Sequence, residues 1–303
     1  MTALRRPNLF IIGAMKSGTT SLHEYLDTHP QIAMSFMKEP GYFVEELNLR
    51  QGEEWYLSLF DRDDRYRYVG ESSTHYTKLP VYQGVPERIH QFNPDARLIY
   101  IMRNPFERMV SHYWHAVRDA YHGGEPRPLL KAVQEKPEYL AFSDYARQLE
   151  PYFELFGGDS VLTLTFESMV ADPQREVDRV YRWLGLAPQP IGGERSVKPR
   201  NQKPPAMMGV AGAGVLNRIQ YSKAWDRISP HFPAWMKNWA KKRAYRQVDE
   251  QQSGEDVRRL KETVAELQRS QVEQLSRLLG RDFPEWGIEA AAPTGLQAAS
   301  GAM

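Results

Sequence analysis

The sequence predicts an α/β fold in which a parallel sheet is flanked by helices on both faces, with a helical extension at the C-terminus. Short apolar runs that suit buried strands alternate with amphipathic helical stretches, and each clear run leads directly into a turn and a helix. These runs span residues 9–12, 97–102 and 161–166. The length of 303 residues suits one large domain. We therefore expect a single domain over residues 1–290 and a disordered tail over 291–303.

Capping residues predict where the helices that follow these strands begin. Asn104 and Pro105 supply an N-cap and a first-turn proline, so a helix is expected from Pro105 through Val117. The pair at 172–173, Asp-Pro, predicts the start of a second helix that ends near Trp183.

The last third of the chain predicts the helical extension. A long helix is expected to begin at Ser253, with Asp256 three residues on, and to end at Gly280. Its apolar stripe suits core packing better than a dimer seam. The stripe contains Val257, Leu260, Val264, Leu267, Leu275 and Leu278. Residues 204–287 together form the expected lid or extension within the domain.

Composition and charge exclude several classes of protein. Lys and Arg total 39 against 38 for Asp and Glu, a formal net charge of +1, so no global field draws the chain to nucleic acid or to an acidic membrane. There is no cysteine, which excludes disulfides and cysteine-based metal sites. The apolar run that begins at Leu9 is too short for a signal peptide, and no window suits a membrane-spanning helix. We expect a cytoplasmic protein.

The segment 235–246 differs from the rest in composition. It combines Trp and Met with Lys and Arg, as helices at membrane surfaces do. A lid or a packed surface helix has the same composition, so peripheral membrane contact is one of two alternatives for this segment.

A phosphate-binding loop is predicted at residues 13–20, Gly-Ala-Met-Lys-Ser-Gly-Thr-Thr. A strand, a glycine-containing turn and a helix in this order point backbone N–H groups at a phosphate, so the sheet is P-loop-like. In nucleoside triphosphatases a lysine follows the second glycine directly. Here Thr19 occupies that position and the lysine lies within the turn, as Lys16. A positive charge at Lys16 suits a bridging oxygen that becomes anionic as a group leaves, and no metal is then required. The expected donors to the phosphate are Ser17, Gly18, Thr19 and Thr20.

Residues 10–22 resemble the 5′-phosphosulfate loop of the sulfotransferases that use 3′-phosphoadenosine 5′-phosphosulfate (PAPS). The stretch 100–113 is similar to the 3′-phosphate motif of that family, including the interval from Arg103 to Ser111. An arginine at a strand end can hold a phosphate with two charge-assisted hydrogen bonds.

A third motif, residues 196–200, resembles the loop that covers the nucleotide in the heparan-type enzymes. This resemblance assigns Lys198 and Arg200 to nucleotide binding, and a solvated basic loop is the alternative. The resemblance covers most of residues 7–287 and is closer to the heparan sulfate branch than to the cytosolic small-molecule branch.

The resemblance leaves two candidates for the general base that must take the acceptor's proton. Glu39 matches the position of the catalytic glutamate in heparan-type members, whereas His75 lies near the point where the cytosolic members use a histidine. Ser72 stands where the heparan-type enzymes carry a second lysine, which argues against a heavily sulfated glycan as acceptor.

The sequence thus predicts a sulfotransferase that moves a sulfuryl group from PAPS to a hydroxyl or amine by in-line displacement. The acceptor is a carbohydrate, a lipid or another small molecule, and neither a nucleic-acid partner nor an oligomeric state is indicated. Two other classes of protein share parts of these motifs. A small-molecule or nucleotide kinase would need a lysine at position 19 and a magnesium-binding acid. A non-catalytic nucleotide-binding module would have no use for both Lys16 and Glu39.

Overall fold

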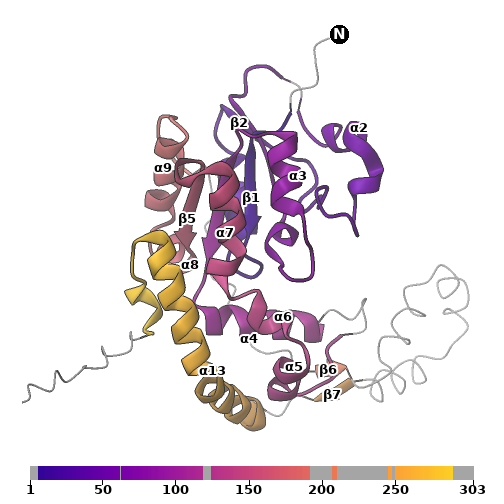
Figure 1. The fold of residues 1–303 in the computed structure, drawn as a ribbon, viewed down its shortest axis with the longest axis vertical. Coiled ribbons are helices and arrows are strands. Elements are labelled where there is room, and N and C mark those ends of the chain that lie inside the picture. Colours follow the sequence, from indigo (N-terminus) through magenta and orange to yellow (C-terminus); the bar gives the residue numbers. More distant parts are fainter. Residues whose placement is uncertain are drawn as a thin grey trace, which may run out of the picture.

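A computed structural model describes residues 6–61, 63–118, 124–191, 207–209, 245–247 and 250–288. Five parallel strands form the central sheet in the order β2-β3-β1-β4-β5 (Figure 1). Their bounds are β1 Leu9–Gly13, β2 Ile32–Met34, β3 Tyr68–Ser72, β4 Arg97–Met102 and β5 Val161–Thr165. The three predicted strands are confirmed as β1, β4 and β5. The sequence does not reveal β2 and β3, because β2 has only three residues and β3 carries Gly70 and Glu71 in place of an apolar run.

Helices flank the sheet on both faces, which confirms the predicted fold class (Figure 1). In chain order they are α1 Thr19–Leu26, α2 Gly52–Leu57, α3 Val85–Phe92, α4 Pro105–Arg118, α5 Leu129–Glu135, α6 Glu138–Ala141, α7 Tyr145–Phe156, α8 Phe166–Ala171, α9 Pro173–Trp183 and α13 Glu250–Leu279. Short 3-10 turns are η1 Leu49–Gln51, η2 Thr74–Thr77, η4 Gly158–Ser160 and η6 Pro284–Trp286. An antiparallel pair, β6 Met207–Gly209 and β7 Tyr245–Gln247, lies apart from the main sheet.

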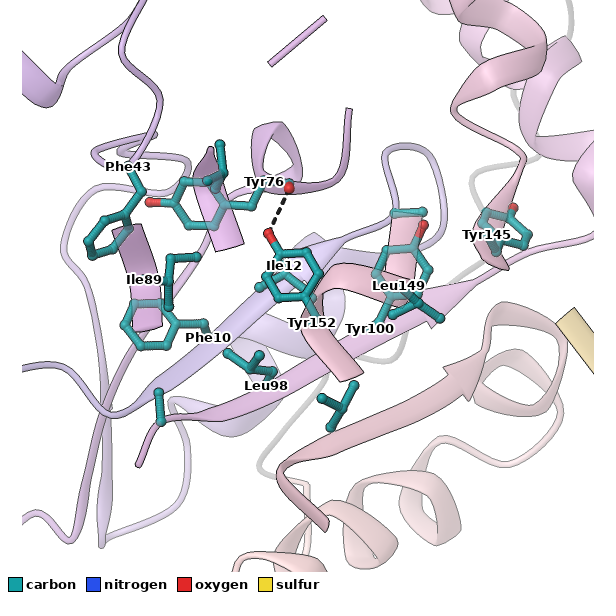
Figure 2. Close-up of a cluster of buried hydrophobic side chains, with 14 of the residues drawn as sticks. Phe10, Ile12, Phe43, Tyr76, Ile89, Leu98, Tyr100, Tyr145, Leu149 and Tyr152 are labelled. Carbon is teal, nitrogen blue, oxygen red and sulfur yellow. Dashed lines mark hydrogen bonds between the residues drawn. The ribbon is translucent and has the colours of Figure 1, made fainter. Parts of the chain in front are cut away.

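The period-2 alternation of β1 divides the core into two layers. Phe10 and Ile12 face a cluster that includes side chains of α3 and α7 (Figure 2). Leu9 and Ile11 face the opposite cluster, which includes side chains of α1 and α9. Because β1 lies in the middle of the sheet and is buried on both faces, the loop at its carboxyl end is anchored on a rigid support.

The predicted helix caps are present. Asn104 Oδ1 accepts hydrogen bonds from the backbone N–H groups of Phe106 and Glu107 at 3.0 and 3.2 Å, and α4 begins at Pro105 as expected. Asp172 caps α9 through the N–H of Arg175 at 3.0 Å.

The long C-terminal helix α13 begins three residues before the predicted Ser253 and ends, as predicted, at Gly280, which has φ +64°. Its first half packs with α4 and α5 in a third cluster, and its second half packs on the α7 face of the sheet (Figure 1). The prediction that Leu267 belongs to the buried stripe is wrong, since its side chain is 46% exposed and Gln268 beside it is buried. One straight stripe cannot face two separate clusters over 30 residues, so the buried face shifts along the helix.

The segments 204–206 and 210–244 lie outside the described residues. They include nearly half of the predicted lid or extension 204–287 and most of the basic aromatic segment 235–246. Within the described ranges, no helix is long and apolar enough to cross a membrane.

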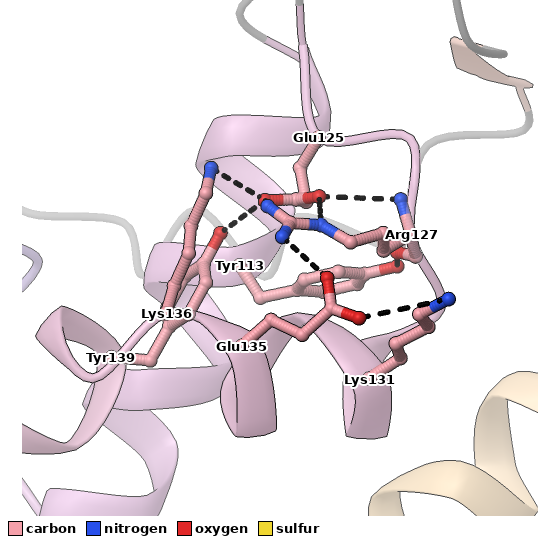
Figure 3. Close-up of polar contacts among 7 residues, drawn as sticks. All are labelled: Tyr113, Glu125, Arg127, Lys131, Glu135, Lys136 and Tyr139. Carbon is pink, nitrogen blue, oxygen red and sulfur yellow. Dashed lines mark hydrogen bonds and ion pairs between the residues drawn. The ribbon is translucent and has the colours of Figure 1, made fainter.

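A buried carboxylate ties the segment before α5 to its neighbours (Figure 3). Glu125 is fully buried and accepts hydrogen bonds from Arg127 Nε at 2.6 Å and from Lys136 Nζ at 2.8 Å. Tyr113 of α4 donates from its hydroxyl to the carbonyl of Arg127 at 2.9 Å. Burial raises the pKa of Glu125, but the bonds from Arg127 and Lys136 outweigh burial and bring it to about 2. This cluster therefore fixes the α5 region to the helix that carries Ser111.

Candidate active site

The predicted phosphate loop wraps around the carboxyl end of β1. Gly18 has φ +93° and is followed directly by α1, in which the N–H groups of Ser21 and Leu22 donate to the Gly18 carbonyl. The N–H groups of Thr19 and Thr20 come too early in the helix to find an acceptor within it. A Cβ atom on Gly18 would lie 2.9 Å from the ring of Phe166, so a side chain would have no room there. The loop is thus a compact set of backbone donors at a helix N-terminus, which suits an anion.

Lys16 lies in a strongly positive environment. Its pKa is lowered first by burial, then by the charges of Arg118 and Arg103, whereas Glu39 acts in the opposite direction. Several cations held this close together repel one another, and a bound polyanion relieves that repulsion. Of these cations, the sequence did not indicate Arg118. It lies seven residues after Ser111 on α4, and this two-turn interval on one helix face is the signal that could have found it.

The second predicted anion site lies against the first. The guanidinium of Arg103 is 5.0 Å from the ring centroid of Phe166, the same ring that packs on Gly18. The structure therefore brings the phosphate loop and Arg103 to one aromatic side chain, although 85 residues separate Gly18 from Arg103 in the sequence. Ser111 is half-buried on α4, two turns beyond Arg103.

The turn that carries Arg103 is held by residues from distant parts of the chain. The Tyr145 hydroxyl donates to the Arg103 carbonyl at 2.7 Å. The backbone N–H of Asn104 and the indole N–H of Trp286 donate to the two carboxylate oxygens of Glu167, at 2.8 and 3.0 Å. The Asn104 amide donates to the Trp286 carbonyl at 2.8 Å. Glu167 and Trp286 thus position the turn that presents Arg103.

The two candidate bases lie next to each other. His75 Nδ1 is 3.5 Å from Glu39 Oε2, so the pair is in contact although 36 residues separate the two in sequence. Thr74 donates from its hydroxyl to the same oxygen at 3.0 Å, and Lys38 Nζ contacts Glu39 Oε1 at 2.8 Å. The Glu39 carboxylate is therefore fixed at both of its oxygens.

The protonation states of this pair follow from their surroundings. Burial raises the pKa of Glu39, but the charge and hydrogen bond of Lys38 outweigh it, and the pKa lies below the ordinary value of 4.5. Burial and the charge of Lys78 lower the pKa of His75 to about 4, against the opposing effect of Glu39. At neutral pH the site therefore holds an ionised carboxylate beside an uncharged imidazole, and either can accept a proton.

Backbone strain is concentrated at two of the residues that the sequence singled out. Among the described residues, Lys16 at φ +70° and Glu39 at φ +58° are the non-glycine residues with positive φ. Such a conformation costs about 1 kcal/mol or more, and it persists only where the surroundings impose it. Strain of this kind is typical of functional sites.

A cavity of about 740 Å³ opens beside α1 and the strand end of β2. Thr20, His23, Ser35, Phe36 and Lys38 contribute to its lining. The Phe36 side chain is 75% exposed at this position. Because Lys38 contacts Glu39 and Thr20 belongs to the phosphate loop, the cavity adjoins both halves of the site.

Two predicted nucleotide-binding residues, Lys198 and Arg200, lie outside the described residues. In the described part of the chain, no group of three or more His, Cys, Asp or Glu side chains could hold a metal ion.

A family model described as "Sulfotransferase domain" matches residues 6–200. Human "Heparan sulfate glucosamine 3-O-sulfotransferase 6" is 30% identical over 187 residues, which cover 60% of this chain and 53% of that protein. Mouse "Bifunctional heparan sulfate N-deacetylase/N-sulfotransferase 1" is 26% identical over 204 residues, covering 61% of this chain and 23% of the relative. The chain thus matches about half or less of the length of these relatives.

Among solved structures, a sulfotransferase from Alicyclobacillus acidocaldarius has the same fold. It aligns with a TM-score of 0.65 at 24% identity, over 93% of this chain and 99% of that chain. This alignment extends beyond the family match and includes the C-terminal part of the fold.

Proposed function

The chain belongs to the sulfotransferase domain family, and from this premise we propose that it transfers a sulfuryl group from PAPS to a hydroxyl or amine of a carbohydrate acceptor. Two groups of one site carry the proposal. One is a lysine with a strained backbone in a loop suited to an anion, and the other is an ionised carboxylate whose charge acts on that lysine. These are the two groups that in-line transfer requires, one for the leaving phosphate and one for the acceptor's proton.

The donor side fits a nucleotide with phosphates at both its 5′ and 3′ positions. The N–H groups at the start of α1 suit the 5′-phosphate, and Gly18, at φ +93°, provides the turn that leads from the loop into the helix. Arg103 and Ser111 would hold the 3′-phosphate, and Lys198 and Arg200 would cover the nucleotide. When bound, PAPS supplies the sulfuryl group and a phosphate leaving group.

The chain's own residues have separate tasks in this scheme. Lys16 stabilises the negative charge that develops on the bridging oxygen when the sulfur–oxygen bond breaks. Glu39 takes the proton of the acceptor as the new bond to sulfur forms. His75, uncharged and in contact with Glu39, is the second candidate for this task.

The acceptor would enter through the cavity beside α1. Lys38, which contacts Glu39, lines this cavity, and the hydroxyl and imidazole groups there, next to the exposed Phe36 ring, suit a sugar. The heparan sulfate relatives, by their names, act on a glycan. A lipid or another small molecule is the alternative acceptor, and the proposed location is the cytoplasm.

Two measurements test the proposal. Calorimetry should give tight binding of adenosine 3′,5′-bisphosphate and much weaker binding of ATP, with no need for magnesium. Labelled sulfate from PAPS should then be transferred to a member of an acceptor panel that includes a glucosamine-containing oligosaccharide, a neutral oligosaccharide and a long-chain alcohol. Binding of ATP in preference to the bisphosphate, or transfer to none of these acceptors, would contradict the proposed function.

A further inference from the structure

A fully buried carboxylate, Glu71, lies at the end of β3, close to the turn that carries Glu39. Its Oε1 accepts hydrogen bonds from the hydroxyls of Tyr56 at 2.8 Å and Tyr76 at 2.5 Å, and its Oε2 accepts one from Ser73 at 2.6 Å. Because these three groups donate, the carboxylate has partners for its ionised form without a cation. Burying a carboxylate without a cation is costly, so its position calls for a reason.

The hydrogen bond between Ser73 and Glu71 connects Glu71 to the turn that carries the proposed base, Glu39. Ser73 Oγ accepts a hydrogen bond from the backbone N–H of Gly41 at 3.0 Å. A hydroxyl has one hydrogen, and Ser73 donates it to Glu71 in a hydrogen bond. The lone pairs of Ser73 are thereby left for Gly41. Glu71 thus determines the direction in which Ser73 can act.

The turn 39–41 depends on this arrangement. Glu39 and Gly41 both have positive φ, +58° and +57°, and Pro40 between them has no N–H. The remaining N–H groups of the turn both bond to the end of β3: that of Glu39 to the Ser72 carbonyl at 2.9 Å, and that of Gly41 to Ser73 Oγ. Without these bonds, nothing in the backbone of Glu39 would favour its strained conformation.

We propose that Glu71 is a positioning residue for the reaction: by orienting the Ser73 hydroxyl it holds the turn 39–41, and so aims the Glu39 carboxylate at the acceptor. This inference rests on the proposed function in one respect, the role of Glu39. Glu71 itself does not touch the reacting atoms.

The ionisation of Glu71 supports this role. Burial raises its pKa to about 7, against the lowering effect of its hydroxyl partners. Besides Tyr56 and Tyr76, the ionisable groups whose charges couple to it are Glu39 and, on α7, Tyr152. A protonated Glu71 must donate its own hydrogen, which competes with the present direction of the Ser73 hydroxyl. The turn should therefore be held less firmly below about pH 7.

The test uses Glu71→Gln and Ser73→Ala, with Tyr56→Phe as the matched control. All three changes remove one group from the same buried cluster, but Tyr56 has no link to Gly41. We expect kcat for the transfer of labelled sulfate from PAPS to a glucosamine-containing oligosaccharide to fall about tenfold to a hundredfold in the first two variants. The KM for PAPS should stay within about twofold, and Tyr56→Phe should keep its kcat within a similar factor.

A second readout does not need the reaction. Hydrogen exchange at the Gly41 amide should be faster in Glu71→Gln and Ser73→Ala than in the wild type or Tyr56→Phe. In the wild type it should speed up as the pH falls through about 7, after correction for intrinsic exchange, and Glu71→Gln should lack this dependence. If Glu71→Gln does not fold, Ser73→Ala still tests the link, since it removes only one hydroxyl.

The outcomes separate the two proposals. Unchanged Gly41 exchange in both variants overturns the inference, as does changed exchange with unchanged kcat, which would leave Glu71 a structural role alone. A failure of the proposed function is recognised differently, by the absence of sulfate transfer in the wild type itself. Changed exchange together with lowered kcat supports the positioning role.

Discussion

The loop around Lys16 and the turn around Glu39 each bring a residue with positive φ to the same site, but they are held in different ways. The Lys16 loop is closed locally, since the Ser17 N–H donates to the Ala14 carbonyl and α1 starts directly after Gly18, and the Ala14 N–H anchors it to the Ile101 carbonyl of β4. The Glu39 turn is held by residues more than 30 positions away, at the end of β3. The Lys16 loop is thus closed mainly by local bonds, whereas the N–H groups of the Glu39 turn are held by a distant part of the fold.

The largest expected effect tests the acceptor side directly. Glu39→Gln should lower kcat by about 10² to 10⁴, because the amide cannot take the acceptor's proton. The KM for PAPS should change little, and His75→Ala should lose less than about tenfold if the imidazole only supports Glu39. Steady-state transfer of labelled sulfate measures both, with Glu54→Gln on exposed α2 as a control. If Glu39→Gln keeps full activity while His75→Ala has none, the two roles must be exchanged.

Removal of the Lys16 charge should lower kcat nearly as much. Lys16→Ala should lower kcat by about 10² to 10³, since one charge-assisted donor to the leaving oxygen is lost. Binding of adenosine 3′,5′-bisphosphate by calorimetry should weaken far less, because the backbone donors of the loop remain. Lys131→Ala, on an exposed part of α5, is the matched charge control. Turnover close to that of the wild type would remove Lys16 from the mechanism.

A smaller effect should separate the two phosphate sites. Arg103→Ala should weaken the binding of adenosine 3′,5′-bisphosphate by about 10- to 100-fold, which corresponds to the loss of one or two hydrogen bonds to a charged group. Binding of adenosine 5′-monophosphate, which lacks the 3′-phosphate, should change by less than about twofold. An equal loss for both ligands, measured by calorimetry, would show that Arg103 does not distinguish the 3′ position.

Glu125, which lies outside both loops, should have the smallest effect on activity and act on stability instead. Glu125→Gln should lower the free energy of unfolding by about 1–3 kcal/mol, because the bonds to Arg127 and Lys136 lose their charge assistance. The folded-state pKa of Glu125 is depressed from 4.5 to about 2, so its contribution is fully present above about pH 4.5 and is lost as the pH falls toward 2.

Urea unfolding at pH 7 and at pH 3 should therefore give a smaller difference between wild type and variant at the lower pH. An equal difference at both values would show that the charge of Glu125 is not involved. The kcat of this variant should stay near that of the wild type, in contrast with the two loops.

The local part of the molecule could be predicted from sequence, and the part made by long-range contacts could not. The strands β1 and β4, the cap at Asn104 and the loop at Lys16 each depend on adjacent residues, so their patterns are visible in the chain. The contact of Glu39 with His75 and the charge of Arg118 near Lys16 arise only when separate elements pack together. The stripe of α13 was predicted wrongly at Leu267 for a similar reason, because two clusters rather than one decide which face is buried.

The bond between Asn104 and Trp286 joins two residues 182 positions apart in the chain. Nascent chains grow at about 5–20 residues per second, so on the order of 10 to 40 seconds pass between the synthesis of Asn104 and that of its last partner. During that time the residues of β1 and β4 have already been synthesised, yet the turn that carries Arg103 lacks its partner Trp286. The proposed phosphate loop is therefore synthesised long before the turn that carries Arg103 can be completed, and the proposed nucleotide binding should be acquired only at the end of synthesis.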